Sequence, residues 1–401
     1  MPLPKIISVD DHVVEPAGVW QDRLPRKWLD EGPRLERRVG WMDWTPGAPS
    51  FIEDDSAASR PVDVWRYEDT VWPLPRGFAQ VGSNEFGGLL VTYDDIVPGA
   101  YQQRARLADL DANGVEASLC FPTFPRESGQ RFLRARDREL ALACVQIYND
   151  WLIEDWCGGD GRGRLIPVTL IPLWDPELAA TEIRRCADKG SHAITFHQQP
   201  ADLGLPSIHW GDWEPVFRAC EETQTVINIH LGSVSRMPVT APDAPDDVLE
   251  TITVESTINS FVDWILSGVL EQHGTLRVAF AEGQAGWIPF FVEQMDKIWE
   301  RNAQFGDPHK RLPRPPSEYL PGRVYASVFD DVHSLGGRAS IGMGHLTVEV
   351  DYPHDESTFP HTTSTLEKLV QTAGLSPLET WQLLRGNAIE CYRLQRIGLL
   401  S

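Results

Sequence analysis

Basic residues are scarce in this chain, which has 36 Lys and Arg residues against 58 Asp and Glu residues and a formal net charge of −22. This excess of negative charge argues against nucleic acid or an anionic membrane surface as a partner. The sequence also has no run of 18 apolar residues and no apolar leader segment at its start. From these absences we expect a soluble, cytoplasmic protein.

Cysteine pairs and nucleotide-binding glycine patterns are missing as well. The six cysteines are scattered, without a Cys-x-x-Cys pair or a cluster, so we expect reduced core thiols rather than a disulfide framework or a zinc finger. No Rossmann glycine pattern opens a βαβ unit, so the sequence gives no indication of a bound flavin or nicotinamide. A redox reaction would therefore need an external electron donor.

What the sequence has in quantity is an alternation of short apolar runs with helical stretches. The runs are rich in β-branched residues and mostly lack polar alternation, which is typical of parallel strands buried on both faces. They are Ile6–Asp10, Ala117–Phe121, Leu165–Leu170, Ala193–His197, Val226–His230, Arg277–Glu282, Val324–Phe329 and Thr347–Asp351. The helical stretches include Gln103–Ala112, Asp137–Glu154, Pro176–Lys189, Trp213–Glu222, Thr253–His273 and Pro289–Asn302. Eight such units predict an α/β fold of the (β/α)8 (TIM) barrel class, with residues 1–401 forming one domain.

Two long segments interrupt this rhythm, and both follow strand ends. Residues 32–100, rich in Trp and Pro, are expected to form a cap-like insertion after the first strand, and residues 233–250, rich in Pro, a lid-like loop. Segments in these positions lie on the face of a barrel where substrates bind. The tryptophans of the insertion either line a large apolar pocket or pack the insertion onto the barrel; they are Trp41, Trp44, Trp65 and Trp72.

Metal-competent side chains stand at the ends of five of the predicted strands. Asp10 and His12 are two residues apart on the first strand, so their side chains share a face. The other four strand ends carry a histidine or a carboxylate, at the rim where barrel enzymes place their chemistry. The predicted metal ligands are Asp10, His12, His197, His230, Glu282, Asp351 and His354. One zinc ion needs only three protein ligands and a water molecule, so seven candidates favour two ions.

Two further residues near the strand ends have roles that the sequence leaves open. Glu15 is either a partner of the first-strand pair or a surface residue before Pro16. His361 follows the last strand closely and is able to reach the pocket.

The motifs Asp10-x-His12, His197, His230 and Asp351-Tyr352-Pro353 together resemble the decarboxylase-like branch of the amidohydrolase superfamily, over nearly the whole chain. The resemblance implies that the first-strand pair, His197 and Asp351 hold one divalent ion and that His230 acts in acid–base chemistry. Asp10 departs from the usual His-x-His or Glu-x-His of that branch. Glu282 stands where members with two metals usually have a histidine.

Three segments, residues 9–16, 281–289 and 351–357, resemble more narrowly a subgroup of barrel-fold nonheme diiron monooxygenases of platensimycin and platencin biosynthesis. This resemblance implies two iron ions, O2 as cosubstrate and a CoA-linked diterpenoid acyl substrate. We predict His230 and Glu282 as the catalytic groups. Arg126 and Arg236 follow strand ends and are candidates for contacts with the CoA phosphates.

The sequence thus supports two functions. The leading one is a nonheme diiron monooxygenase of a large acyl-CoA-like substrate, because a mixed carboxylate and imidazole set suits iron in O2-activating sites. The alternative is a mononuclear zinc or manganese decarboxylase or hydrolase, in which Asp10, His12, His197 and Asp351 hold the ion and His230 is the acid–base group. A homo-oligomer is compatible with both.

Overall fold

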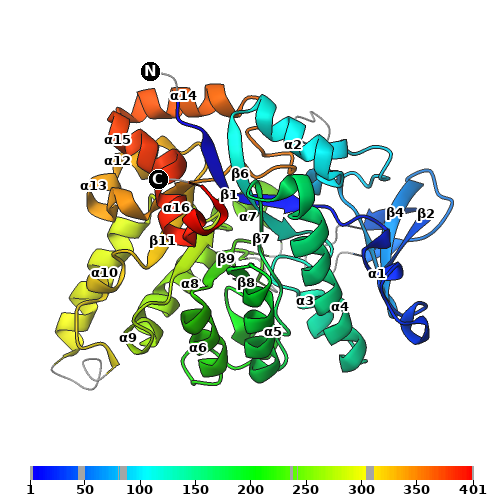
Figure 1. The fold of residues 1–401 in the computed structure, drawn as a ribbon, viewed down its shortest axis with the longest axis horizontal. Helices are drawn as coiled ribbons and strands as arrows, with labels where there is room; N and C mark the ends of the chain where they lie inside the picture. Colours follow the sequence, from blue (N-terminus) through cyan, green and yellow to red (C-terminus); the bar gives the residue numbers. More distant parts are fainter. Residues whose placement is uncertain are drawn as a thin grey trace.

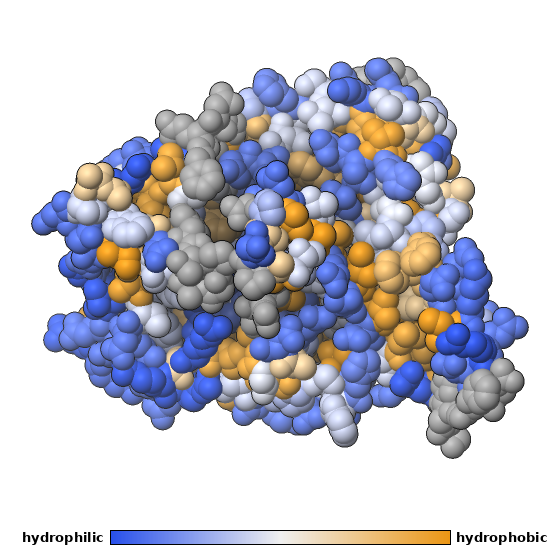
Figure 2. Space-filling view, turned by 180° about the vertical axis from the view of Figure 1, so that it is seen from behind, coloured by the Kyte–Doolittle hydropathy of each residue, from blue (hydrophilic) through white to orange (hydrophobic). Residues whose placement is uncertain are grey.

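The computed structural model describes residues 3–43, 50–79, 81, 88–234, 238–241, 243–303 and 311–399. Trp44 and Arg236 lie outside these residues. Within them, none of the helices combines the length and the apolar character that crossing a membrane requires. On the face shown in Figure 2, hydrophilic residues predominate and apolar residues form separate patches, in keeping with the strong negative charge of the chain.

Eight parallel strands form the centre of the fold (Figure 1). They are β1 (Ile6–Val13), β6 (Val115–Pro122), β7 (Leu165–Pro167), β8 (Ala193–Phe196), β9 (Val226–His230), β10 (Val278–Ala281), β11 (Val324–Val328) and β12 (Leu346–Val348). Their order in the sheet is β7-β6-β1-β12-β11-β10-β9-β8. A parallel bridge between Thr169, just after β7, and Ile194 of β8 joins the two outer strands. The sheet therefore closes on itself, and the predicted (β/α)8 barrel is confirmed.

Helices follow the strands and cover the outside of the barrel (Figure 1). The longer ones are α2 (Gln103–Ala112), α4 (Arg138–Trp151), α5 (Pro176–Asp188), α6 (Glu214–Thr223), α8 (Glu255–Leu266), α10 (Ile288–Asn302) and α14 (Thr362–Ala373). The shorter ones are α1 (Gly18–Gln21), α3 (Gln130–Leu133), α7 (Asp246–Ile252), α9 (Val269–Gln272), α12 (Val332–Gly336), α13 (Arg338–Ile341), α15 (Pro377–Trp381) and α16 (Asn387–Tyr392). The predicted helix Thr253–His273 is divided into α8 and α9 at Gly268, whose φ of +88° does not fit a helix.

The start of the barrel is filled from within by the C-terminal segment. Ile389 and Leu394 belong to the same buried cluster as Ile7 at the start of β1. The hydroxyl of Tyr392 donates a hydrogen bond of 2.6 Å to Oδ1 of Asn228 on β9. The interior is therefore closed at the N-terminal ends of the strands.

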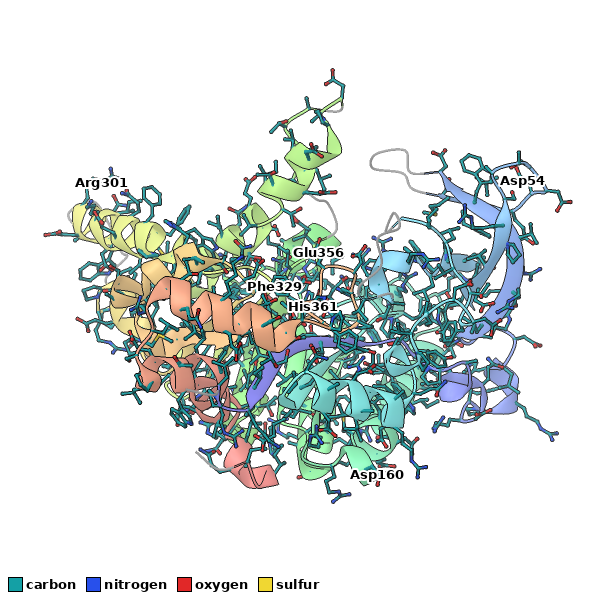
Figure 3. All side chains as sticks on the ribbon, turned by 90° about the horizontal axis from the view of Figure 1, so that it is seen from above. Asp54, Asp160, Arg301, Phe329, Glu356 and His361 are labelled. Carbon is teal, nitrogen blue, oxygen red and sulfur yellow. The ribbon has the colours of Figure 1, made fainter. Side chains whose placement is uncertain are left out.

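The predicted insertion at residues 32–100 contains a second sheet, which lies beside the barrel (Figure 1). Its four antiparallel strands, in the order β3-β2-β4-β5, are β2 (Arg34–Asp43), β3 (Ser50–Ile52), β4 (Arg60–Tyr67) and β5 (Thr70–Pro73). Trp65 pairs with Trp72 across β4 and β5, and its ring stacks on Phe124 with 4.9 Å between the centroids. The insertion thus packs against the loop that follows β6. In the segment predicted as a lid, α7 projects away from the barrel (Figure 3).

Candidate metal centre

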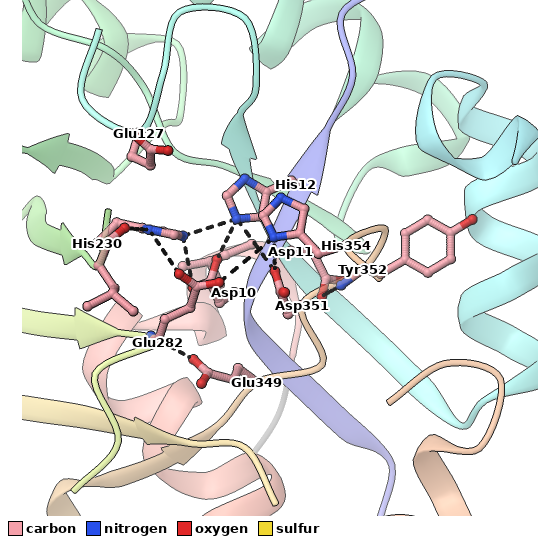
Figure 4. A network of polar contacts seen from close by, with 12 residues as sticks. Asp10, Asp11, His12, Glu127, His230, Glu282, Glu349, Asp351, Tyr352 and His354 are labelled. Carbon is pink, nitrogen blue, oxygen red and sulfur yellow. Dashed lines mark hydrogen bonds and ion pairs between the residues drawn. The ribbon is translucent and has the colours of Figure 1, made fainter. Parts of the chain in front are cut away.

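Six of the seven predicted ligands meet at the C-terminal ends of the strands (Figure 4). Asp10 and His12 come from β1, His230 ends β9, Glu282 follows β10, and Asp351 and His354 follow β12. They form two groups in which potential ligand atoms lie within 4.8 Å of one another. One group is Asp10, His12, His230 and Glu282, and the other is His12, Glu282, Asp351 and His354. The two groups therefore share His12 and Glu282.

Short distances connect the members of the first group. Nε2 of His230 lies 3.0 Å from Nε2 of His12 and 3.2 Å from Oδ2 of Asp10. Nε2 of His12 lies 3.5 Å from Oδ1 of Asp10. Two imidazole nitrogens and a carboxylate thus face one point, which is the arrangement of donors around a bound cation.

The second group is equally compact, and Glu282 stands between the two. Oδ1 of Asp351 lies 3.0 Å from Nδ1 of His354 and 3.6 Å from Nε2 of His12. The rings of His12 and His354 stack with their centroids 4.0 Å apart. Oε2 of Glu282 lies 3.5 Å from Nδ1 of His230, while Oε1 lies 3.8 Å from Nδ1 of His354. One carboxylate oxygen of Glu282 therefore faces each group.

The cluster fits a divalent cation because two of its carboxylates are buried and face only the imidazoles of the cluster. Both oxygens of Asp10 and Oδ1 of Asp351 are buried and accept no hydrogen bond from outside the cluster. A buried carboxylate in this condition is unfavourable unless a cation compensates it. Burial accordingly raises the pKa of Asp10, and that of Asp351 well above its ordinary range. A bound cation would favour the ionised forms instead.

The histidines are oriented for ligation by contacts with backbone carbonyls. Nδ1 of His230 lies 2.5 Å from the carbonyl oxygen of Leu231, and Nδ1 of His12 lies 3.4 Å from that of Pro122. When Nδ1 donates to a carbonyl, Nε2 is left unprotonated and free to bind a cation. In both residues it is Nε2 that lies within 3.5 Å of Asp10, whereas the contact of His230 with Glu282 is through Nδ1.

Two of the six residues adopt a backbone conformation that is rare outside glycine. Glu282 and Asp351 both have a φ of +57°, in the left-handed region that side chains disfavour. Local hydrogen bonds hold them there: the Glu282 amide donates to Oε2 of Glu349 at 3.0 Å and to Oγ of Ser327 at 3.1 Å. The Asp351 amide donates to the Asp10 carbonyl at 2.8 Å. Strain that is maintained in this way is common at functional sites.

Two supporting carboxylates were not anticipated from the sequence. Glu349 is buried and holds the Glu282 amide, and burial raises its pKa well above the ordinary range. Asp11 accepts hydrogen bonds from Oγ of Ser8 and from the amide of Tyr352, both at 3.0 Å, so it ties β1 to the loop after β12. Glu349 follows β12 directly and stands two residues before Asp351, and this nearness to a predicted ligand is the signal by which it could have been found.

His197, the seventh predicted ligand, lies outside both groups. It is buried just beyond β8, its Nδ1 accepts a hydrogen bond of 3.0 Å from the Gln199 amide, and its Nε2 has no hydrogen-bond partner. Burial lowers its pKa to about 4. His197 is thus a neutral imidazole, separate from the cluster.

The residues whose roles were left open have distinct positions. Glu15 is fully buried and accepts hydrogen bonds from the amides of Thr123 at 3.0 Å and Phe124 at 2.8 Å, so it holds the loop after β6. His361 is exposed at the beginning of α14 (Figure 3). Arg126 lies in the loop after β6, where its Nη2 donates to the carbonyl of Gly232 at 3.0 Å.

Two cavities adjoin the cluster. The first, of about 390 Å³, is lined by His230, Glu282 and Asp351 among others. The second, of about 360 Å³, has a largely apolar wall that includes Trp65, Trp72, Phe78 and Phe124, and it also touches His12 and His354. Arg126 lines both cavities. Two of the four insertion tryptophans thus line an apolar pocket that reaches the cluster.

A closed (β/α)8 barrel with such a cluster at the C-terminal rim has the architecture of metal-dependent barrel enzymes. A family model described as Amidohydrolase matches residues 95–394, well over half of the chain. The chain belongs to this amidohydrolase family.

Solved structures with the same fold span almost the whole chain. An amidohydrolase of Mycobacterium avium subsp. paratuberculosis is 19% identical with a TM-score of 0.71, covering 97% of this chain and 99% of its own. The IDCase of Metarhizium anisopliae, in apo form, is 17% identical with a TM-score of 0.67, covering 98% of each chain. A dihydroxybenzoic acid decarboxylase of Polaromonas, with bound manganese and the inhibitor 2-nitroresorcinol, is 16% identical with a TM-score of 0.59, covering 100% of each chain. At these identities, the likeness shows the fold.

Proposed function

We propose that the protein is a metal-dependent enzyme that holds two divalent ions in this cluster and cleaves a bulky, acidic substrate without net oxidation, by loss of CO2 or by hydrolysis. The overlap of the two ligand groups carries the proposal of two ions. The two oxygens of a carboxylate can serve two ions, whereas one imidazole nitrogen serves one. Glu282, which belongs to both groups and has one oxygen near His230 and the other near His354, would help to hold both ions.

Family membership supports the non-oxidative reaction. The matching family is described as Amidohydrolase, and the neighbours named for an activity include a dihydroxybenzoic acid decarboxylase that contains manganese. Carboxylate ligands suit hard ions such as Mn²⁺. This proposal keeps the reaction class of the alternative derived from the sequence but changes its ligand set, since His197 lies outside both groups.

The residues around the cluster divide the work of such a reaction. Bound divalent ions supply Lewis-acid polarisation of a substrate oxygen. Without a bound ion, burial by itself lowers the pKa of His230, but Asp10 and Glu282 outweigh this effect and raise it well above the ordinary range. Because Nε2 of His230 would hold an ion in the proposed cluster, binding of that ion would displace the proton. The apolar wall formed by Trp72 and Phe124 holds the body of the substrate and excludes water from the reacting group.

An anaerobic assay tests this function. Protein loaded with Mn²⁺ is incubated without O2 with a panel of aromatic carboxylic acids and their esters, and CO2 and cleaved products are measured by mass spectrometry. We expect product to form without O2, in proportion to the bound metal. Product that forms only with O2, and that carries an oxygen atom from labelled O2, would overturn the proposal.

A diiron monooxygenase is the second candidate, and the composition of the cluster favours it. Three carboxylates and three imidazoles, with one carboxylate between the two groups, are the donor types of carboxylate-bridged diiron proteins. In this function the substrate is a CoA-linked, diterpenoid-type acyl group, and electrons come from an external donor. Arg126 and Arg236 are the candidate contacts to the CoA phosphates.

Iron loading separates the second candidate from the first. Anaerobically purified protein is loaded with ferrous iron and given a reductant, labelled O2 and a bulky acyl-CoA. O2 consumption that depends on the substrate, with one labelled oxygen atom in the product, would establish the monooxygenase. Unlabelled cleavage products under the same conditions would exclude it.

A further inference from the structure

Arg131 of α3 is a partly buried cation, and two of its hydrogen-bond donor atoms are buried and unused. It lines the apolar cavity of about 360 Å³ that also touches His12 and His354. Its Nε and Nη1 atoms are buried and have no hydrogen-bond partner. The guanidinium lies over the ring of Trp72, with Cζ 3.9 Å from the centroid. Stacking on an aromatic ring holds the guanidinium plane in place but satisfies none of its N–H groups.

The carboxylates near Arg131 are engaged elsewhere. Glu15 accepts the amide hydrogens of Thr123 and Phe124, and Oε2 of Glu127 lies 3.2 Å from Nε of Arg126. Among the residues that the structure describes, no ion pair to Arg131 within 4.0 Å is present alongside these contacts. Glu127 and Glu15 favour the charge of Arg131 only from beyond ion-pair distance. Its two buried donor atoms without a hydrogen bond are therefore available to an anion brought into the cavity.

The position of the cavity indicates what kind of molecule brings that anion. Arg131 and the ligands His12 and His354 all contribute to its walls, and the aromatic rings of Trp65, Trp72 and Phe124 line it as well. A flat, apolar body stacks on such rings. One molecule can therefore present an oxyanion to Arg131 and a second functional group to the metal cluster.

We infer that Arg131 binds an oxyanion of the substrate, a carboxylate or a phosphate, on an aromatic or other flat apolar body that fills this cavity. Only the identity of the group facing the cluster rests on the proposed function; the anion site itself does not. The substrate class is thus an apolar acid whose anionic group is separate from the group that reacts.

Binding of three matched probes tests the site directly. The probes are 2-naphthoate, 2-naphthyl phosphate and the neutral 2-naphthamide, and the full chain is titrated in EDTA so that no metal contributes. Affinity is measured by calorimetry. We expect at least one of the two anions to bind about tenfold or more tightly than the amide, since hydrogen bonds between charged groups exceed neutral ones. The better anion distinguishes a carboxylate site from a phosphate site.

Two substitutions locate the effect at Arg131. Arg131→Met should remove the preference for the anion and leave the amide affinity unchanged, while Arg131→Lys should retain part of the preference. Arg104→Met is the matched control: its side chain is 90% exposed on α2, so it changes the net charge equally without touching the cavity.

Equal affinity of the wild-type protein for anions and amide would overturn the inference, and so would an equal loss of anion affinity in Arg131→Met and Arg104→Met. If Arg131→Met does not fold, the wild-type titrations and Arg131→Lys still decide. Metal content and turnover play no part in this experiment, so its failure is distinct from failure of the proposed function.

Discussion

The two ends of the barrel use the same strands in opposite ways, and β9 shows this within two residues. Near the closed end, the side-chain amide of Asn228 donates to the Ile194 carbonyl at 2.9 Å and its Oδ1 accepts from Tyr392 at 2.6 Å. His230, two residues further on and on the same face, points into the metal cluster. The side chain of Asn228 is thus paired within the protein, whereas the buried oxygens of Asp10 and Asp351 at the open end accept no hydrogen bond from outside the metal cluster.

This difference separates stability from function along the barrel axis. Residues whose hydrogen bonds are all satisfied within the protein contribute to the free energy of unfolding, whereas unpaired buried carboxylates reduce it and are retained for a ligand. Substitutions at the closed end should therefore destabilise the protein without affecting the metal, and substitutions in the cluster should do the reverse.

The largest effect on metal content and activity is expected for a substitution of Glu282, which would help to hold both ions at the open end of the barrel. Glu282→Ala should remove about one of two bound ions per chain and reduce activity below detection, because within the described residues Glu282 is the carboxylate that belongs to both groups. Metal content of purified protein, measured by elemental analysis, is the decisive quantity. Unchanged metal content in Glu282→Ala would mean that the centre holds a single ion.

A closed-end substitution is expected to reverse the pattern. Asn228→Ala leaves the Tyr392 hydroxyl and the Ile194 carbonyl without their partners, so we expect a loss of about 2–4 kcal/mol in the free energy of unfolding. Denaturant unfolding measures this loss, and metal content should stay at the wild-type value. A fall in metal content without loss of stability would contradict the division between the two ends.

Most of the barrel could be predicted from the sequence because its strands are continuous apolar runs. The insertion sheet could not: β2 has consecutive charged residues and no regular alternation with apolar ones, and its pairing with β4 places Arg37 opposite Asp63, where their ion pair is 2.8 Å. Such a strand lacks the apolar signal of a buried one and resembles a loop in sequence. The helix predicted at Thr253–His273 contains a break that only the φ of Gly268 reveals.

The sequence predicts the candidate site only as well as it predicts the ends of the strands. His230 and Asp351 follow from their positions, but His197 occupies an equivalent place in the sequence and lies outside both groups. A position at a strand end predicts that a residue lies at the rim of the barrel. It does not predict how close its side chain comes to the other side chains there. Arg131 has no sequence signal at all, because burial of a charge depends on packing by Trp72 from a distant strand.

A smaller effect is expected at Glu349, which supports the metal cluster by accepting a hydrogen bond from the backbone amide of Glu282. Glu349→Leu removes the acceptor of the Glu282 amide and should weaken metal affinity roughly 10–100-fold. Competition with a fluorescent chelator measures that affinity. Glu349→Gln, which keeps an acceptor oxygen, is the matched control and should retain most of it. Equal losses in both variants would show that charge, not support of the backbone, is what Glu349 contributes.

Glu15 sharpens the comparison because it lies at the open end yet has both oxygens hydrogen-bonded, as residues at the closed end do. Burial raises its pKa to about 7 from 4.5. The folded protein therefore binds this proton more tightly than the unfolded chain, so the contribution of Glu15 to stability is complete below about pH 4.5 and is lost as the pH rises towards 7. Between pH 5 and 7 the loss is about 2 kcal/mol.

Glu15→Gln tests this pH dependence because its side chain cannot titrate. The free energy of unfolding is measured in denaturant with EDTA at each pH. From pH 5 to 7 the wild-type value should fall relative to that of Glu15→Gln by this amount. A constant difference between the two proteins from pH 5 to 7 would show that Glu15 is ionised throughout. In that case its two amide donors, and not burial, dominate its electrostatics.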